Sequence, residues 1–212
     1  MRAKLNIAVF ASGKGSNFSA IIDAIEAGTI REAEIVLVVS NNSDAGALTI
    51  ARNHGIPAMH LSEAQFGSEG EFCEKLLQEL HNHHANIIVL AGYMKKIDPT
   101  IIRRFTNRIV NIHPALLPEF GGRGMYGMNV HRAVLASGAS TSGASVHIVD
   151  EEYDHGRVLL QKPVPVLPGD TPETLAARVL AVEHKLYPEA IRLIAEGQLA
   201  LDVEQPTSST SQ

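Results

Sequence analysis

Asn6–Ala27, NIAVFASGKGSNFSAIIDAIEA, decides the fold class of this chain. Asn6 is followed by five apolar residues in a row, two of them β-branched, and Asn6–Ala11 is therefore typical of a buried parallel strand. Ser12 and Gly13 end the run, and apolar side chains then return at helical spacing, at Phe18, Ile21, Ile22 and Ile25. The stretch therefore predicts one strand–loop–helix unit.

The same alternation continues along the chain. Further strands are predicted over Glu34–Val39, Pro57–Leu61, Asn86–Leu90 and Ile109–Ile112, and helices over Ala45–His54 and Phe72–His81. Strands that alternate with helices of this length form parallel sheets with right-handed crossovers. We expect a single Rossmann-like α/β domain, with a mostly parallel twisted sheet and helices on both faces.

The pattern changes after the fifth strand. Ser142–Val149 and Val158–Val166 predict two strands added in antiparallel fashion, and Pro163 and Pro165 favour an edge position for the second. A short helix is expected over Val130–Ala136. A long one should begin near Asp170–Glu173, where a cap residue, Pro172 and an acid coincide, and should end near Ala195.

We place one domain at residues 1–196. The tail 197–212 is expected to be partly disordered, since Gln205–Gln212 is rich in Ser and Thr.

Composition narrows the class of partner. The 212 residues carry a net charge of −5, and the 18 Lys and Arg are scattered, so neither nucleic acid nor a membrane is an expected partner. Small molecules or further copies of the chain, as in a homodimer, fit better. Cys73 is the only cysteine and is expected in the core; a lone thiol and no signal-like start predict a cytoplasmic protein.

Arg108–Pro118, RIVNIHPALLP, carries the first candidate site. Asn111 and His113 stand two residues apart on the predicted strand, so their side chains share one face. Pro114 favours a strand end there, and ligands of open α/β sheets bind at the carboxyl ends of strands. An Asn N–H can stabilise an oxyanion by roughly 3–4 kcal/mol, and His can move a proton near neutral pH.

Asp154 lies in a predicted turn between two later strands. The plain interpretation of DEEYDHG is a solvated acidic turn. If the turn folds back onto His113, the carboxylate would raise the pKa of that imidazole and fix its orientation.

Ser12–Asn17, SGKGSN, joins the first strand to the first helix. Glycines and a helix N-terminus favour an anion there, whereas the alternative is a tight turn with Ser16 or Asn17 as helix N-cap. A dinucleotide-binding fingerprint is excluded for two reasons. Phe18 stands three positions after Gly15, where the fingerprint needs its third small residue, and the acid expected at the end of the second strand is missing from Ser40–Asn42. No GxxxxGK[ST] motif is present, so a phosphate monoester is the expected ligand.

A metal site is not expected. His81, His83 and His84 crowd a predicted helix C-terminus, where imidazoles suit the helix dipole, and no ligand spacing accompanies them.

Five segments together resemble the phosphoribosylglycinamide formyltransferases, a folate-dependent family within the formyltransferase superfamily. They are SGKGSN, VLAGYMKKI (Val89–Ile97), VNIHPALLP (Val110–Pro118), SGASVHIVDEEYDHG (Ser142–Gly156) and the helix around Glu183–His184. The resemblance implies transfer of a formyl group from 10-formyltetrahydrofolate, as co-substrate, to the amine of glycinamide ribonucleotide in purine synthesis, without metal.

The resemblance also implies roles for individual residues. Asn111, His113 and Asp154 match the catalytic trio, in which Asp154 keeps His113 charged and oriented. The ribonucleotide contacts match Gly15, Ser16, Asn17 and Glu183. The folate pocket matches Met94, Lys95, Lys96, Ile97, Asn111, Asp150, Glu151, Glu152, Tyr153 and Asp154.

Two residues and one loop depart from the family pattern. Glu69 stands where an Arg would hold the folate, and Leu180 stands where the family often has a polar residue beside Glu183. The loop Gly121–Gly127 is longer than in the shortest family members and is a candidate lid.

Three other functions stay open. A 10-formyltetrahydrofolate hydrolase would use similar residues but has no need of the phosphate loop. A methionyl-tRNA formyltransferase would need a further basic domain, and a binding module would not need the trio.

Overall fold

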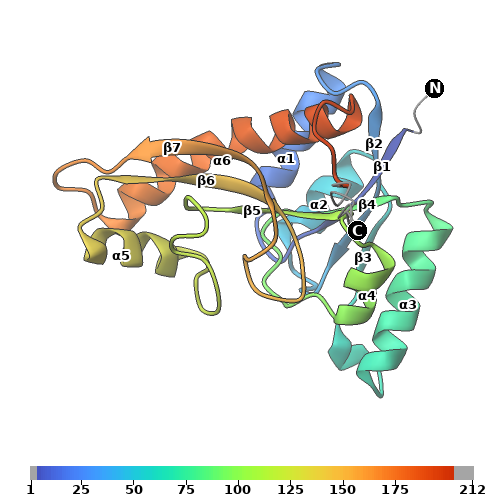
Figure 1. Cartoon of the computed structure of the whole chain (residues 1–212). Coiled ribbons are helices and arrows are strands. Elements are labelled where there is room, and N and C mark those ends of the chain that lie inside the picture. The colour runs from blue at the N-terminus through green and yellow to red at the C-terminus, as the bar shows by residue number, and fades with distance from the viewer. Residues whose placement is uncertain (1–3, 203–212) are drawn as a thin grey trace, which may run out of the picture.

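The computed structural model describes residues 4–202 and contains a seven-stranded sheet in the order β3-β2-β1-β4-β5-β6-β7 (Figure 1). The strands are β1 (Leu5–Phe10), β2 (Ala33–Ser40), β3 (Ala58–His60), β4 (Ile87–Leu90), β5 (Ile109–His113), β6 (Thr141–Ile148) and β7 (Val158–Pro165). The first five pair in parallel, and β6 and β7 are antiparallel additions. The predicted fold class is confirmed, and β7 is an edge strand as its prolines predict.

Helices cover both faces of the sheet. They are α1 (Ser16–Glu26), α2 (Gly46–Asn53), α3 (Glu69–Asn82), α4 (Pro99–Arg104), α5 (Met128–Ser137) and α6 (Pro172–Ala195), with a short 3₁₀ helix η1 (Glu63–Gln65). Side chains of α1, α2, α5 and α6 belong to one apolar core, and those of α3 and α4 to another. Strand β1 contributes to both, because its residues alternate between the faces.

Two short helices were missing from the sequence prediction, η1 and α4. The start of α4 nevertheless carries ordinary signals: the Asp98 side chain accepts a hydrogen bond from the Thr100 N–H at 2.6 Å, and Pro99 occupies the first turn. The long helix α6 begins as predicted, with Thr171 as N-cap. Cys73 is buried in the core, also as predicted.

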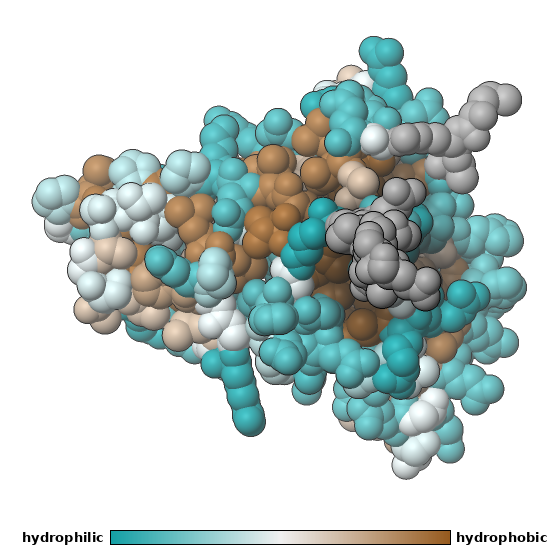
Figure 2. All heavy atoms as spheres, in the orientation of Figure 1, coloured by the Kyte–Doolittle hydropathy of each residue, from teal (hydrophilic) through white to brown (hydrophobic). Residues whose placement is uncertain are grey.

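Hydrophilic and apolar residues gather on different parts of the surface. In the view of Figure 2, α3 presents mostly hydrophilic residues at the edge of the molecule, whereas apolar residues reach the surface along β7 and α6. The charged outer side and buried inner side of α3 follow from its helical periodicity.

Packing continues past the predicted domain end at residue 196. The Arg157 guanidinium donates to the backbone carbonyls of Ala200 and Leu201 at 2.7 and 2.9 Å. Arg108 forms an ion pair with Asp202 at 2.8 Å. Residues 197–202 therefore lie against the domain, while the predicted disorder of Gln205–Gln212 lies outside the described residues.

The sheet changes from parallel to antiparallel at β5, and this junction positions the candidate site. β5 pairs in parallel with β4, where Leu90 faces Asn111, and antiparallel with β6, where Asn111 faces His147. It ends at His113, as Pro114 predicts. The end of β5 is thus reached by chain segments from both halves of the sheet.

Candidate functional site

A cavity of about 670 Å³ opens at the ends of β4 and β5. Most residues predicted to bind or react line it: Asn17, Met94, Lys95, Lys96, Ile97, Asn111, His113, Asp150, Glu152, Tyr153, Asp154 and Glu183. Gly15, Ser16 and Glu151 do not. The size suits a small organic molecule rather than a polymer.

The predicted trio comes together in this cavity. His113 is 3% exposed, and its Nδ1 lies 3.5 Å from Asp154 Oδ2. Its Nε2 donates to the Phe120 carbonyl at 2.8 Å, because a carbonyl oxygen only accepts. Asp154 therefore folds back onto His113, and the solvated-turn interpretation is wrong for this residue.

His147, which the sequence prediction missed, connects the members of the trio. Its Nδ1 donates to the Ile148 carbonyl at 2.9 Å, so Nε2 of the neutral ring accepts from Asn111 Nδ2 at 3.1 Å. The same Nε2 lies 3.6 Å from Asp154 Oδ1. This contact fixes the Asn111 amide with its nitrogen toward His147, and the second N–H of that nitrogen stays available to a ligand.

The Asp154 carboxylate raises the pKa of His113, as predicted, but the net shift of that pKa is downward. Burial lowers the pKa of this imidazole, and the Asp154 carboxylate and the Phe120 carbonyl oppose that effect without overcoming it. Burial likewise lowers the pKa of His147. Burial of the two rings thus favours their neutral forms, whereas Asp154 favours the charged form of His113.

Three glycines and a left-handed backbone conformation hold Asp154 in place. Asp154 has a φ of 55°, in the left-handed region that Asp tolerates better than most residues. A Cβ at Gly156 would lie 2.0 Å from the Ile148 carbonyl oxygen, so only glycine fits there. Gly122 donates its N–H to Asp154 Oδ2 at 3.0 Å, and a Cβ at Gly121 would lie 3.1 Å from the Asp154 Cβ.

Asn17 and Glu183 form a second polar pair, between α1 and α6. Asn17 Nδ2 donates to Glu183 Oε2 at 2.6 Å, and Glu183 is 7% exposed. Burial raises the pKa of the Glu183 carboxyl group. The Asn17 Oδ1 atom is buried and has no hydrogen-bond partner among residues 4–202.

The turn before α1 is built around Gly15. This residue has a φ of 81°, and a Cβ on it would lie 2.9 Å from the Ala47 Cα. Gly15 is the N-cap of α1 and no side chain caps it, so the alternative of Ser16 or Asn17 as N-cap is wrong. Ser16 is exposed as the first helical residue, and the uncapped N–H groups of α1 can receive an anion.

The predicted folate segments face each other across the cavity. The Lys96 ammonium lies 5.4 Å from the centre of the Tyr153 ring, which joins the two segments. Glu151 instead forms an ion pair with Arg103 at 3.2 Å, outside the cavity lining. Leu180 lines the cavity, whereas Glu69 begins α3 and does not.

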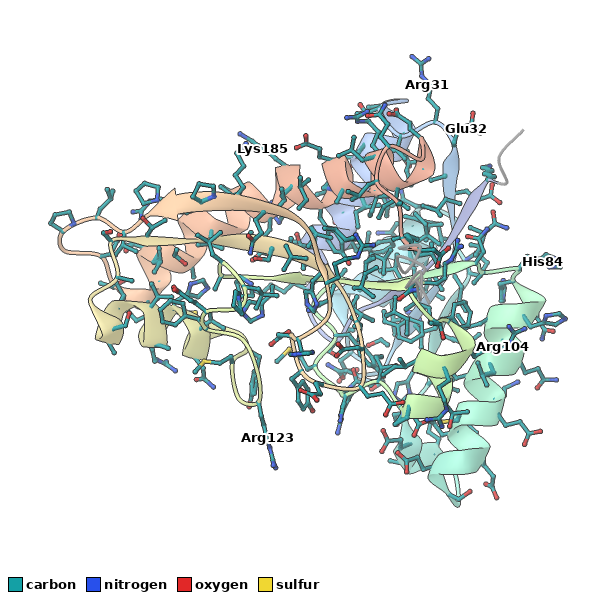
Figure 3. The ribbon with its side chains drawn as sticks, in the orientation of Figure 1. Arg31, Glu32, His84, Arg104, Arg123 and Lys185 are labelled. Carbon is teal, nitrogen blue, oxygen red and sulfur yellow. The ribbon has the colours of Figure 1, made fainter. Side chains whose placement is uncertain are left out.

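The loop Gly121–Gly127 borders the cavity from Gly122 to Gly127. Arg123 at its tip points away from the rest of the domain (Figure 3). Its role as a lid stays a prediction.

The described residues contain no group of three or more His, Cys, Asp or Glu suited to a metal ion, and no helix among them is long and apolar enough to cross a bilayer.

Fold and site together define a class: a Rossmann-like α/β protein with a cluster of Asn111, His113, His147 and Asp154 where its sheet changes from parallel to antiparallel. Residues 5–191 match the formyl transferase family, so the chain belongs to that family.

Individual relatives agree with this assignment. The chain is 46% identical over 193 residues to the chloroplastic phosphoribosylglycinamide formyltransferase of Vigna unguiculata, covering 91% of this chain and 62% of the relative. It is 38% identical over 197 residues to phosphoribosylglycinamide formyltransferase of Escherichia coli (strain K12), covering 93% and 90%. The crystal structure of glycinamide ribonucleotide transformylase 1 from Symbiobacterium toebii superposes with a TM-score of 0.88 at 40% identity, covering 95% and 92%. The chain therefore spans less than two thirds of the plant relative but nearly all of the other two.

Proposed function

We propose that this protein transfers the formyl group of 10-formyltetrahydrofolate to the amine of glycinamide ribonucleotide, giving formylglycinamide ribonucleotide and tetrahydrofolate. The names of its relatives support this acceptor. The observation that carries the proposal is that Asn111, His113 and Asp154 open into the same cavity as Asn17 and Glu183. One ligand bound at each end would bring two reacting groups together.

The Asn111 amide suits the start of the reaction. The acceptor amine attacks the formyl carbon, a C–N bond forms, and the carbonyl electron pair moves to oxygen. An amide N–H already oriented by His147 can stabilise that oxyanion by roughly 3–4 kcal/mol.

His113 is arranged to take up and release a proton. Burial lowers the pKa of this imidazole, which favours its neutral form. Once protonated, both N–H groups have acceptors, the Phe120 carbonyl at Nε2 and Asp154 at Nδ1. The proton that leaves the amine can therefore be held at Nδ1, beside Asp154. It passes to the folate nitrogen as the oxyanion collapses and the bond between the formyl carbon and that nitrogen breaks.

Substrate contacts follow from the two ends of the cavity. Gly15, Ser16 and Asn17 would hold the phosphate at the N-terminus of α1, and Glu183 would contact the ribonucleotide. Met94–Ile97 and Asp150–Asp154 would line the pterin pocket; Glu151 would have to leave Arg103 to take part.

Three further expectations accompany this proposal. The reaction needs no metal, the protein works in the cytoplasm, and it can form a homodimer. The compartment and the oligomeric state stay predictions, and the plant relative is described as chloroplastic.

Release of tetrahydrofolate separates this function from its alternatives. The purified protein is mixed with 10-formyltetrahydrofolate, with and without glycinamide ribonucleotide. Release that requires the ribonucleotide supports transfer. Release at the same rate without it identifies a hydrolase, and no release identifies a binding module.

A further inference from the structure

His131 is a buried imidazole that the proposed mechanism leaves unused. It lies on α5, lines the cavity and is 5% exposed. Its Nδ1 is shut off from solvent and has no hydrogen-bond partner among residues 4–202. Because Nδ1 is closed off, the Nε2 edge of the ring is the one left to face the cavity.

The position of His131 links two walls of the cavity. α5 packs against α6, whose Ala176 and Leu180 line the same space. The ring is also near enough to His113 for a charge on His113 to disfavour a charge on His131. His131 thus lines the cavity that also contains Glu183 and the reacting centre.

The neutral form of the His131 imidazole carries a single proton, on either Nδ1 or Nε2. Burial lowers its pKa, His113 lowers it further, and no carboxylate opposes them. On Nδ1 the proton would be a buried donor without a partner, which folded proteins rarely contain; a bare Nδ1 is tolerated better. The proton therefore belongs on Nε2, where the N–H faces the cavity.

We propose that His131 donates this Nε2–H to the oxygen of the reacting formyl group, as a second oxyanion donor beside Asn111. The proposal rests on the proposed function, since it needs a carbonyl oxygen at this place. A donor aimed at charge that develops during the reaction stabilises the transition state more than the bound substrate. Its loss should therefore appear in kcat rather than in KM.

Two variants separate donation from packing. His131→Phe keeps a ring but has no donor, and we expect kcat to fall about 100-fold with both KM values within about threefold. His131→Gln offers a neutral N–H at comparable reach and should recover at least about tenfold of that loss. The loss in His131→Phe should be the same from about pH 7 to about pH 9, because a neutral donor does not titrate there.

Arg132→Gln is the matched control, since Arg132 is exposed at the next position of α5. It should keep wild-type kcat. A His131→Phe enzyme with kcat within about twofold of wild type would overturn the proposal, and so would a loss confined to KM.

A spectrum of the protein labelled with ¹⁵N-histidine tests the donor without any activity assay. The signal that disappears in His131→Phe should report the Nε2–H tautomer near neutral pH, and an Nδ1–H tautomer or an imidazolium would contradict the proposal. If the wild-type chain transfers no formyl group, the proposed function fails, whereas this spectrum still decides which nitrogen of His131 carries the proton.

Discussion

The two halves of the sheet use their interiors differently. The strands β1 and β4 are buried almost entirely through apolar side chains, whereas β5 and β6 bury His113, Ser142, Ser145 and His147. Burying such groups costs free energy unless hydrogen bonds compensate. His113, Ser145 and His147 have such bonds, to the carbonyls of Phe120, Ala115 and Ile148. The Ser142 Oγ is buried without a partner among residues 4–202. Strands β1 and β4 thus provide an apolar frame, whereas β5 and β6, where the sheet changes from parallel to antiparallel, carry the buried polar groups of the site.

Among the substitutions considered, removing the His113 imidazole should lower kcat the most. His113→Ala should lower kcat roughly 1000-fold and change the Kd of each substrate by less than about threefold, because the imidazole acts on the reaction more than on binding. Steady-state kinetics with calorimetric titration measures both. His81→Ala, on the exposed surface of α3, is the control. Near-full activity of His113→Ala would remove this residue from the mechanism.

Neutralising Asp154 should have the next largest effect. Asp154→Asn keeps the size of the side chain but removes the charge that favours protonation of His113. We expect kcat to fall roughly 100-fold and the pKa of His113, followed by NMR, to move further down. An unchanged or raised pKa of His113 in this variant would show that the carboxylate does not act on the imidazole.

A Gly→Ala substitution should change the free energy of unfolding in opposite directions in the turn that carries Asp154 and in α3. Gly156→Ala places a Cβ 2.0 Å from the Ile148 carbonyl oxygen, so the turn that carries Asp154 must shift. The free energy of unfolding should fall by about 3 kcal/mol and activity should fall with it. In α3, Gly70→Ala meets only the Ser68 Oγ at 3.9 Å and should raise stability by about 0.5–1 kcal/mol. Denaturant unfolding measures both, and equal effects would contradict the comparison.

Lowering the pH should reduce the free energy of unfolding through the buried histidines, a smaller effect than those of the substitutions above. The pKa values of His113, His131 and His147 are lowered from the usual value of 6.5, so the unfolded chain binds more protons than the folded one below that pH. The stability that they contribute is present above pH 6.5 and is lost as the pH falls toward their folded pKa values. Glu183 opposes this trend, because a raised carboxyl pKa favours the folded state on acidification.

The acid effect has a matched pair of variants. With three histidines against one carboxyl group, stability should fall from about pH 7 to about pH 5, and less steeply in His147→Gln than in His81→Gln. Thermal unfolding across this range measures the slopes. Parallel slopes for the two variants would show that His147 does not titrate differently in the folded state.

The sequence predicted the frame better than the network. Apolar runs such as Asn6–Ala11 mark buried strands without knowledge of their neighbours. His147 escaped notice because a single histidine in a strand is usually a core residue, and only the register that places it opposite Asn111 reveals its role.

Burial and turn geometry explain the remaining differences. The direction of the His113 pKa shift depends on how deeply the fold buries the ring, which the spacing of Asn111 and His113 does not determine. Glu151 and Asp154 lie three residues apart in one turn, and backbone geometry alone sends one to Arg103 and the other to His113.

The fate of the formyl carbon tests the central claim most directly. 10-Formyltetrahydrofolate labelled with ¹³C in the formyl group is incubated with the protein and glycinamide ribonucleotide, and the products are followed by ¹³C NMR. We predict that the label appears as a formamide on the acceptor nitrogen, and that His113→Ala slows its appearance roughly 1000-fold. Label that appears as free formate, at a rate independent of the ribonucleotide, would contradict formyl transfer by this site.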